Sequence, residues 1–179
     1  YYMPGINAAS ESKVINENGT VLTTLANTSN CWINSIEGLP NKLFVDTSHY
    51  NDIDPYMIYE TQVYSIPDFT LEHTYSGVAV RAKLENSGEK YYIIKNNPET
   101  FEIVVYNSDH TAWKTVAVPI NNPYETINDV SISELLIGPN SDFKIAYTIH
   151  SNTLDGGHFL TNIVSEDGTI LLSVNEANY

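Results

Sequence analysis

The residues most able to do chemistry in this chain are its five histidines, its single cysteine and its 22 acidic residues. The histidines lie singly, without the His-x-x-x-His or His-Glu spacing of zinc sites, at His49, His73, His110, His150 and His158. Cys31 is alone, which excludes an internal disulfide and a cysteine-based zinc cluster. No Gly-x-Ser-x-Gly, phosphate-loop or dinucleotide motif occurs. We therefore expect no cofactor and assign no catalytic residue.

Two loops carry oxygen or histidine ligands. Asp52 and Asp54 could offer carboxylates to calcium, but the further acids and closing glutamate of an EF-hand loop are missing, and a solvated turn before Pro55 is the competing interpretation. No metal site is therefore predicted. Asp155 and His158 flank Gly156-Gly157, which could let backbone approach a ligand or could simply form a hairpin turn.

Carboxylates near loops could converge as the acid pair of a glycoside hydrolase. The candidates are Asp109, Glu125, Asp129, Glu134 and Asp155. A functional pair would need one member with a raised pKa, which requires a desolvated environment.

Aromatic residues give the stronger signal, because the chain has 13 tyrosines, two tryptophans and five phenylalanines. Tyrosine in loops combines a broad apolar surface with a hydroxyl, which suits sugars or protein partners. Tyrosines inside strands are expected to pack in the core. The predicted ligand-binding residues are Tyr50, Tyr56, Tyr75, Asp109, Trp113, Tyr124, Asp155 and His158.

The elements that must position these residues are strands. Short segments rich in Val, Ile, Tyr, Thr and Phe alternate between apolar and polar residues, and Gly, Pro, Asn, Asp or Ser bound them. Only "SISELLIG" could be a short helix, and a strand with a bend is its alternative. The length of 179 residues suits one domain, so we predict a single all-β domain over residues 1–179.

Internal repetition organises these strands. Residues 76–121 and 130–176 both follow the order strand, turn, strand, loop, strand, Asn/Ser-x-Asp turn, strand, at an offset of about 54 to 58 residues. Residues 25–75 form a weaker third copy, and a hairpin at 13–25 precedes them. The expected fold is therefore all-β, built from antiparallel four-stranded meanders.

Units of this kind resemble the blades of a β-propeller. The turn "NSDHTAWKTVAVP" also resembles the Asp-box of sialidase-like and sortilin-like propellers, with Ser108, Asp109 and Trp113 in the places of its Ser, Asp and Trp, although both spacings are shorter by one residue and the glycine is absent. Because a propeller usually has roughly four to eight blades, the resemblance implies a partial ring or one completed by several chains. A β-sandwich is the alternative.

Charge limits the partners. The net charge of −14 repels phosphate backbones and anionic lipids, so no nucleic-acid partner is expected. No apolar run approaches the roughly 18 to 20 residues of a membrane span, so no membrane insertion by this chain is expected. Sequons begin at Asn18 and Asn27, and the first residues resemble a trimmed precursor. We expect an extracytoplasmic location, secreted or anchored.

Together these features favour a recognition module that binds a carbohydrate or protein partner. The alternatives are a hydrolase that uses paired acids and a scaffold or sensor ectodomain without a small ligand. A precursor with a transmembrane helix and a cytoplasmic domain would favour the last.

Replacing Asp109 and Asp155 separately by Asn tests the hydrolase hypothesis. If either carboxylate belongs to the acid pair, its loss should abolish turnover of glycosides, because a general acid or nucleophile is removed. Unchanged rates would exclude both residues.

Overall fold

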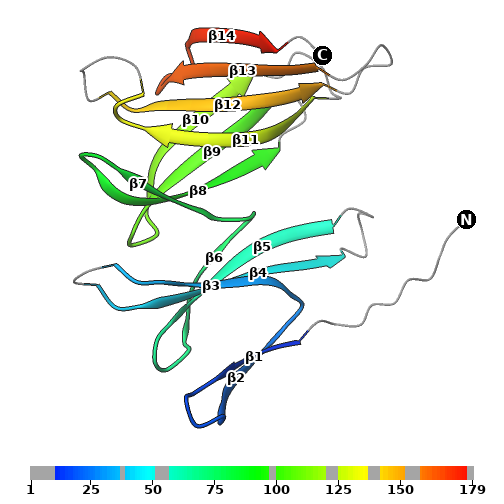
Figure 1. Ribbon diagram of the computed structural model, residues 1–179, viewed down its shortest axis with the longest axis vertical. Helices are drawn as coiled ribbons and strands as arrows, with labels where there is room; N and C mark the ends of the chain where they lie inside the picture. The colour runs from blue at the N-terminus through cyan, green and yellow to red at the C-terminus, as the bar shows by residue number, and fades with distance from the viewer. Residues whose placement is uncertain are drawn as a thin grey trace, which may run out of the picture. The chain divides into compact units, whose positions relative to one another are not determined.

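The computed structural model describes residues 11–36, 39–50, 57–96, 100–119, 125–136, 142–151 and 158–176, and within them every regular element is a β-strand (Figure 1). In chain order the strands are β1 (Glu11–Ile15), β2 (Val21–Ala26), β3 (Thr28–Asn34), β4 (Lys42–Tyr50), β5 (Met57–Ser65), β6 (Leu71–Tyr75), β7 (Val80–Leu84), β8 (Gly88–Asn96), β9 (Thr100–Asn107), β10 (Ala112–Pro119), β11 (Glu125–Ser133), β12 (Lys144–Ser151), β13 (His158–Ser165) and β14 (Ile170–Glu176).

The strands form one hairpin and three antiparallel four-stranded meanders. The chain divides into two compact units, Tyr1–Ala79 and Val80–Tyr179. The first unit contains the hairpin β1-β2 and the sheet β3-β4-β5-β6, and the second contains the sheets β7-β8-β9-β10 and β11-β12-β13-β14. The predicted all-β fold of four-stranded meanders is confirmed. The "SISELLIG" segment continues β11 and then bends after Ser133, so its strand interpretation holds. The single-domain organisation stays a prediction.

One turn recurs at four hairpins, and we call it the recurrent turn. In each copy the backbone N–H of the first residue donates to the carbonyl of a threonine, and the residue before that threonine has positive φ and donates back to the first carbonyl. This is a β-turn closed by a left-handed residue. The copies are Asn16–Thr20, Ser65–Thr70, Asn107–Thr111 and Ser165–Thr169, the second being one residue longer.

A β-bulge follows every recurrent turn at the same place. The second residue after the threonine has no partner in the strand register, because the pairing shifts on either side of it. The unpaired residues are Leu22, Glu72, Trp113 and Leu171. The bulge therefore gives the hairpin and each four-stranded sheet an equivalent side chain beside the recurrent turn.

A lysine also recurs. Lys42, Lys90 and Lys144 begin the second strand of their sheets, or lie near its start, and each pairs with the first residue of the recurrent turn. Lys42 forms an ion pair with the bulge residue Glu72 at 2.9 Å, and the Lys90 ammonium lies 4.8 Å from the ring centroid of the bulge residue Trp113. The three four-stranded sheets are thus equivalent in register as well as in strand order, and the hairpin β1–β2 shares their turn and bulge.

This equivalence gives each sheet two distinguishable faces. We call face A the side that carries the residue two before the recurrent turn, and face B the side that carries the residue one before it. The face A markers are Val14, Val63, Val105 and Ile163, and the face B markers are Ile15, Tyr64, Tyr106 and Val164.

Face A of one sheet packs on face B of the next in both units. In the second unit one core joins Val105 and Val116 from face A of β7–β10 to Ile145 and Val164 from face B of β11–β14. In the first unit a smaller cluster joins face A of the hairpin to face B of β3–β6, through Val14, Leu25, Leu43, Val45 and Tyr64. A sandwich of two symmetrically related sheets would bring equivalent faces together, A on A or B on B. Blades that follow one another in a series instead pack face A of each blade on face B of its neighbour.

Gly168 tests how closely the turn β13–β14 approaches its neighbour. Its φ is +83°, and an added Cβ would lie 2.7 Å from the backbone oxygen of Ala117 on β10. Gly88, in the same unit, has φ +71° with nothing within 4 Å of such a Cβ. Gly88→Ala should therefore cost about 1 to 2 kcal/mol of unfolding free energy from backbone strain alone. Gly168→Ala should cost about 2 to 4 kcal/mol, because a clash is added.

Chemical denaturation of the two variants measures this difference. Equal losses of stability would contradict the close approach of the turn to β10.

Candidate functional site

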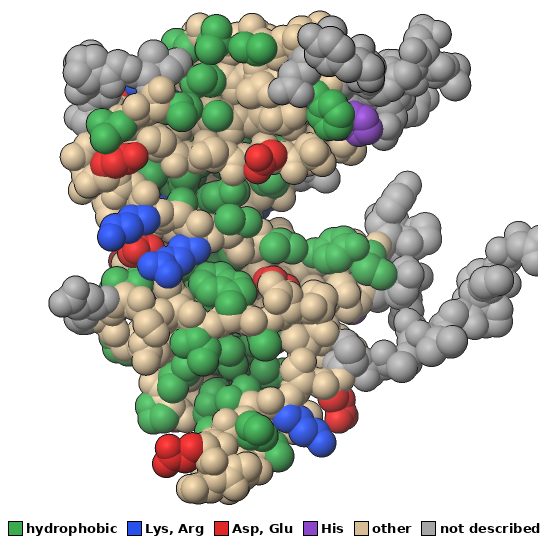
Figure 2. Space-filling model, in the orientation of Figure 1, with side chains coloured by type: hydrophobic (Ala, Val, Ile, Leu, Met, Phe, Trp, Pro, Cys, Tyr) green, Lys and Arg blue, Asp and Glu red, His purple; other side chains and the backbone are tan. Residues whose placement is uncertain are grey.

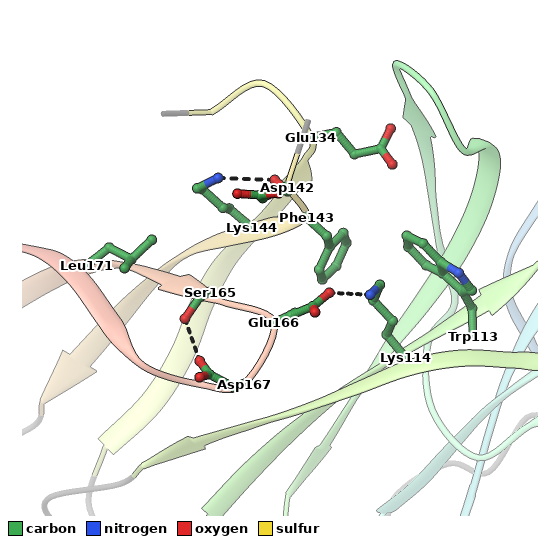
Figure 3. A pocket seen from close by; sticks show the side chains of 10 residues that line it. All are labelled: Trp113, Lys114, Glu134, Asp142, Phe143, Lys144, Ser165, Glu166, Asp167 and Leu171. Carbon is green, nitrogen blue, oxygen red and sulfur yellow. Dashed lines mark hydrogen bonds and ion pairs between the residues drawn. The ribbon is translucent and has the colours of Figure 1, made fainter. Parts of the chain in front are cut away.

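The second unit contains a pocket with a volume of about 630 Å³, larger than a pocket in the first unit. It lies beside the recurrent turn of β13–β14, where β10, the start of β12 and the segment after β11 meet (Figure 3). Its lining residues are Trp113, Lys114, Glu134, Asp142, Phe143, Lys144, Ser165, Glu166, Asp167 and Leu171. A smaller pocket of about 370 Å³ in the first unit has Tyr64 and His49 in its lining but no tryptophan or phenylalanine. The larger pocket is therefore the better candidate for ligand binding.

Trp113 is the centre of this pocket. Its position at the bulge places the indole next to Phe143, with ring centroids 5.2 Å apart and an interplanar angle of 82°. The ammonium groups of Lys90 and Lys114 lie 4.8 and 4.9 Å from the Trp113 ring centroid. Edge-to-face rings and cation–π contacts hold the indole in one orientation. Because Phe143 is only 4% exposed and belongs to the core, the aromatic surface that the pocket presents is mainly that of Trp113, which Phe143 supports from the core.

Behind Trp113 lies a buried polar cluster. Glu134 is only 4% exposed and accepts hydrogen bonds from the backbone N–H groups of Asn86 and Ser87, at 2.6 and 3.0 Å, and from the Ser87 hydroxyl. Lys90, 6% exposed, donates to the Ser87 carbonyl. Burial lowers the pKa of Lys90. Because each buried charge has partners, this cluster fixes the position of Glu134, which lines the pocket.

The rim is more exposed. Lys114 forms an ion pair with Glu166, whose side chain is 60% exposed, and the Lys144 ammonium donates to the Asp142 carbonyl at 3.2 Å (Figure 3). An exposed ion pair adds little stability and is easily rearranged. Lys144 is itself only 7% exposed, so it is the Lys114–Glu166 pair that offers a donor and an acceptor that a ligand could recruit.

Two carboxylates that line the pocket, Glu134 and Asp167, have pKa values below their usual range, as does Asp109 in the recurrent turn of β9–β10. Burial would raise the pKa of Glu134, but the donors from Ser87 and Asn86 outweigh it and the net shift is downward. The Thr111 hydroxyl and N–H lower the pKa of Asp109, and the Ser165 hydroxyl lowers that of Asp167 to about 2. A general acid needs the opposite shift, so these three groups are not suited to that role.

Of the eight residues predicted to bind a ligand, Trp113 lines the pocket. Asp109 lies at the surface in the recurrent turn of β9–β10, where its carboxylate accepts from the Thr111 hydroxyl at 2.6 Å. Tyr75 lies on β6 and is 1% exposed, which argues against direct contact with a ligand. Tyr50 and His158 lie at the ends of β4 and β13, but their side chains are outside the description. Tyr56, Tyr124 and Asp155, like the calcium candidates Asp52 and Asp54, lie outside the described residues.

In the turn that resembles an Asp-box, Asn107 occupies the place that Ser165 has in the turn of β13–β14, and its side-chain amide donates to the Thr111 hydroxyl at 3.0 Å. Asp109 lies within this turn and Trp113 at the bulge after it. The assignment of Ser108, Asp109 and Trp113 to the Asp-box stays a prediction.

Sequence reasoning missed most of the pocket: Lys114, Phe143, Lys144, Glu166 and Leu171. Two signals in the sequence point to it. The pattern Ser/Asn-x-Asp-x-Thr aligns Trp113 with Leu171, and the repeated lysine aligns Lys90 with Lys144. That the pocket forms between the two sheets of the second unit, however, depends on tertiary packing.

The described residues contain no group of three or more His, Cys, Asp or Glu side chains arranged to hold a metal ion. None of them forms a helix of the length and hydropathy that a membrane span requires. Comparisons with family models, with curated proteins and with solved structures found no match for this chain.

The carboxyl of Asp167 should make the second unit sensitive to strong acid. Its pKa is lower in the folded state, so its contribution to stability is complete above the ordinary value of 3.8 and is lost as pH falls through about 2. Ser165→Ala removes the largest cause of this shift. We expect NMR titration to show the Asp167 pKa near 2 in the wild type and closer to 3.8 in the variant.

Asp167→Asn provides the stability test. The variant should lose less stability than the wild type on acidification through this range. Parallel curves for the two proteins would mean that Asp167 titrates normally.

Proposed function

We propose that this protein is a recognition module whose pocket around Trp113 and Phe143 binds a carbohydrate, without catalytic machinery of its own. One observation carries the proposal: an indole and a phenyl ring, held edge to face, line a pocket together with ammonium, hydroxyl and carboxylate groups. Sugars have apolar C–H surfaces between hydroxyls, so they suit a site that alternates aromatic surface with donors and acceptors.

The two lysines beside Trp113 have different roles in this proposal. Lys90 is buried and lies against the Trp113 ring, whereas Lys114 pairs with exposed Glu166 and also lies over the rings of Trp113 and Phe143. A ligand that displaces Lys114 would gain access to the indole at the cost of one weak ion pair and of these cation–π contacts. The same displacement would free both Lys114 and Glu166 to hydrogen-bond the ligand.

Hydrolysis is the less supported function. The carboxylates of the pocket with shifted pKa values, Glu134 and Asp167, favour the ionised form, and the hydrogen bonds that they accept account for it. Such groups maintain the walls of a binding site better than they donate protons to a leaving group. The acid pair that includes Asp155 stays an alternative.

We also propose that the meanders are blades of a β-propeller and that the protein acts outside the cytoplasm. The packing of face A on face B, found in both units, supports blades over a sandwich. The recurrent turn between the third and fourth strands of each four-stranded sheet supports the same interpretation. The extracytoplasmic location rests on the sequence alone.

Fluorescence of Trp113 tests the binding site. Trp32 is the other tryptophan and lies in the first unit, stacked on Phe44 with centroids 4.1 Å apart, so Trp32→Phe leaves Trp113 as the sole indole. A glycan selected on an array should shift the emission of this variant. Phe143→Ala in the same background should weaken binding about tenfold or more, because the buried ring that holds the Trp113 indole in its orientation is lost.

Trp32→Ala is the matched control and should bind with unchanged affinity. Binding that persists in Trp113→Ala, or an array that gives no ligand, would overturn the carbohydrate proposal.

A further inference from the structure

Face A of the sheet β11–β14 is uncovered. The fifth residue after the turn threonine is buried in the hairpin and in the two other four-stranded sheets. These residues are Leu25, Tyr75 and Val116, which are 7%, 1% and 1% exposed. The equivalent Val174 is 48% exposed, and Leu172 on the same face is 47% exposed. In Figure 2 hydrophobic side chains gather at the surface over β14. A position that is core elsewhere in the repeat is therefore solvent-exposed here.

Face B of the hairpin β1–β2 is uncovered in the same way. Ile15 and Val21 pair with each other and are 58% and 49% exposed. The residue equivalent to Ile15 in the last sheet is Val164, which is 0% exposed because face A of β7–β10 covers it. The chain thus leaves one face A and one face B without a partner among the described residues.

We propose that a second copy of this chain supplies that partner, so that face A of β11–β14 in one copy packs on face B of β1–β2 in the next. Three observations favour a second copy. Every sheet-to-sheet contact described within a unit joins a face A to a face B, the two uncovered faces are of these two kinds, and each carries exposed aliphatic side chains, which on the hairpin lie beside the polar pair Lys13 and Thr24. The contact is head to tail, because the two surfaces are different.

The strength of this association follows from its size and charge. The hairpin has two strands, whereas each other sheet has four. The contact of the hairpin with β11–β14 of another copy is therefore smaller than a contact between two four-stranded sheets. Interfaces of small area are commonly weak, and we expect dissociation constants of about micromolar or weaker. The net charge of −14 on each copy opposes association, so added salt should strengthen it.

Sedimentation and light scattering of the whole chain test the inference through blocked variants. Val174→Glu blocks one surface and Ile15→Glu blocks the other, and both residues are exposed, so the monomer should stay folded. The wild type should form oligomers that grow with concentration and salt, whereas each variant alone should be monomeric. Mixed together, the two variants should form a one-to-one dimer and nothing larger, because one intact surface of each kind remains.

Leu39→Glu, at a residue 47% exposed in the connection between β3 and β4, is the matched control and should associate like the wild type. Leu172→Glu should reproduce the effect of Val174→Glu. A wild type that stays monomeric at high concentration and salt would overturn the inference. So would single variants that still associate, or a mixture that forms no dimer, since the latter would mean that the surfaces do not meet head to tail.

Discussion

The packing of face A on face B is the constraint on which the rest of the structure depends. It requires that each sheet be apolar on both faces and that neighbouring sheets keep the same sense. In the second unit face A of β7–β10 contributes Val105 and Val116, while face B of β11–β14 contributes Ile145 and Val164, all at most 1% exposed. Burial of this surface is the main favourable term for folding.

The recurrent turn makes this packing reproducible. Because side chains alternate along a strand, a slip of one residue would exchange the two faces of a sheet. The turn and the bulge after it fix the register of the third and fourth strands, and the asparagine, aspartate and serine side chains satisfy the backbone groups at the turn. The bulge then directs one side chain beside the turn, and in the third sheet along the chain that side chain is Trp113. The turn and bulge that fix the strand register therefore also place Trp113 in the candidate site.

Local patterns were sufficient to predict the strands and their order. Alternation of apolar and polar residues, as in "FEIVVY", and the Asn/Ser-x-Asp turns are patterns of residues that lie close in sequence. Both patterns predict elements that the structure contains, a strand in the first case and a hairpin turn in the second. The segments "NENGTVLTTL" and "NIVSEDGTILLSV" are similar in sequence because each contains a recurrent turn, one of the four copies among the described residues. The pocket depended on distant pairs, such as Trp113 with Phe143 and Lys114 with Glu166, which no local pattern specifies. Tyr75, predicted to bind a ligand from its place at a strand end, is 1% exposed, because its ring packs inside, which the pattern of the strand alone does not specify.

Methyl–methyl nuclear Overhauser effects across the core of the second unit test the central claim most directly. The account predicts contacts from Ile145 and Val164 to the face A residues Ile103, Val105 and Val116. Contacts from the same two residues to Val104, on the opposite side of β9, would mean that equivalent faces meet and would contradict the account.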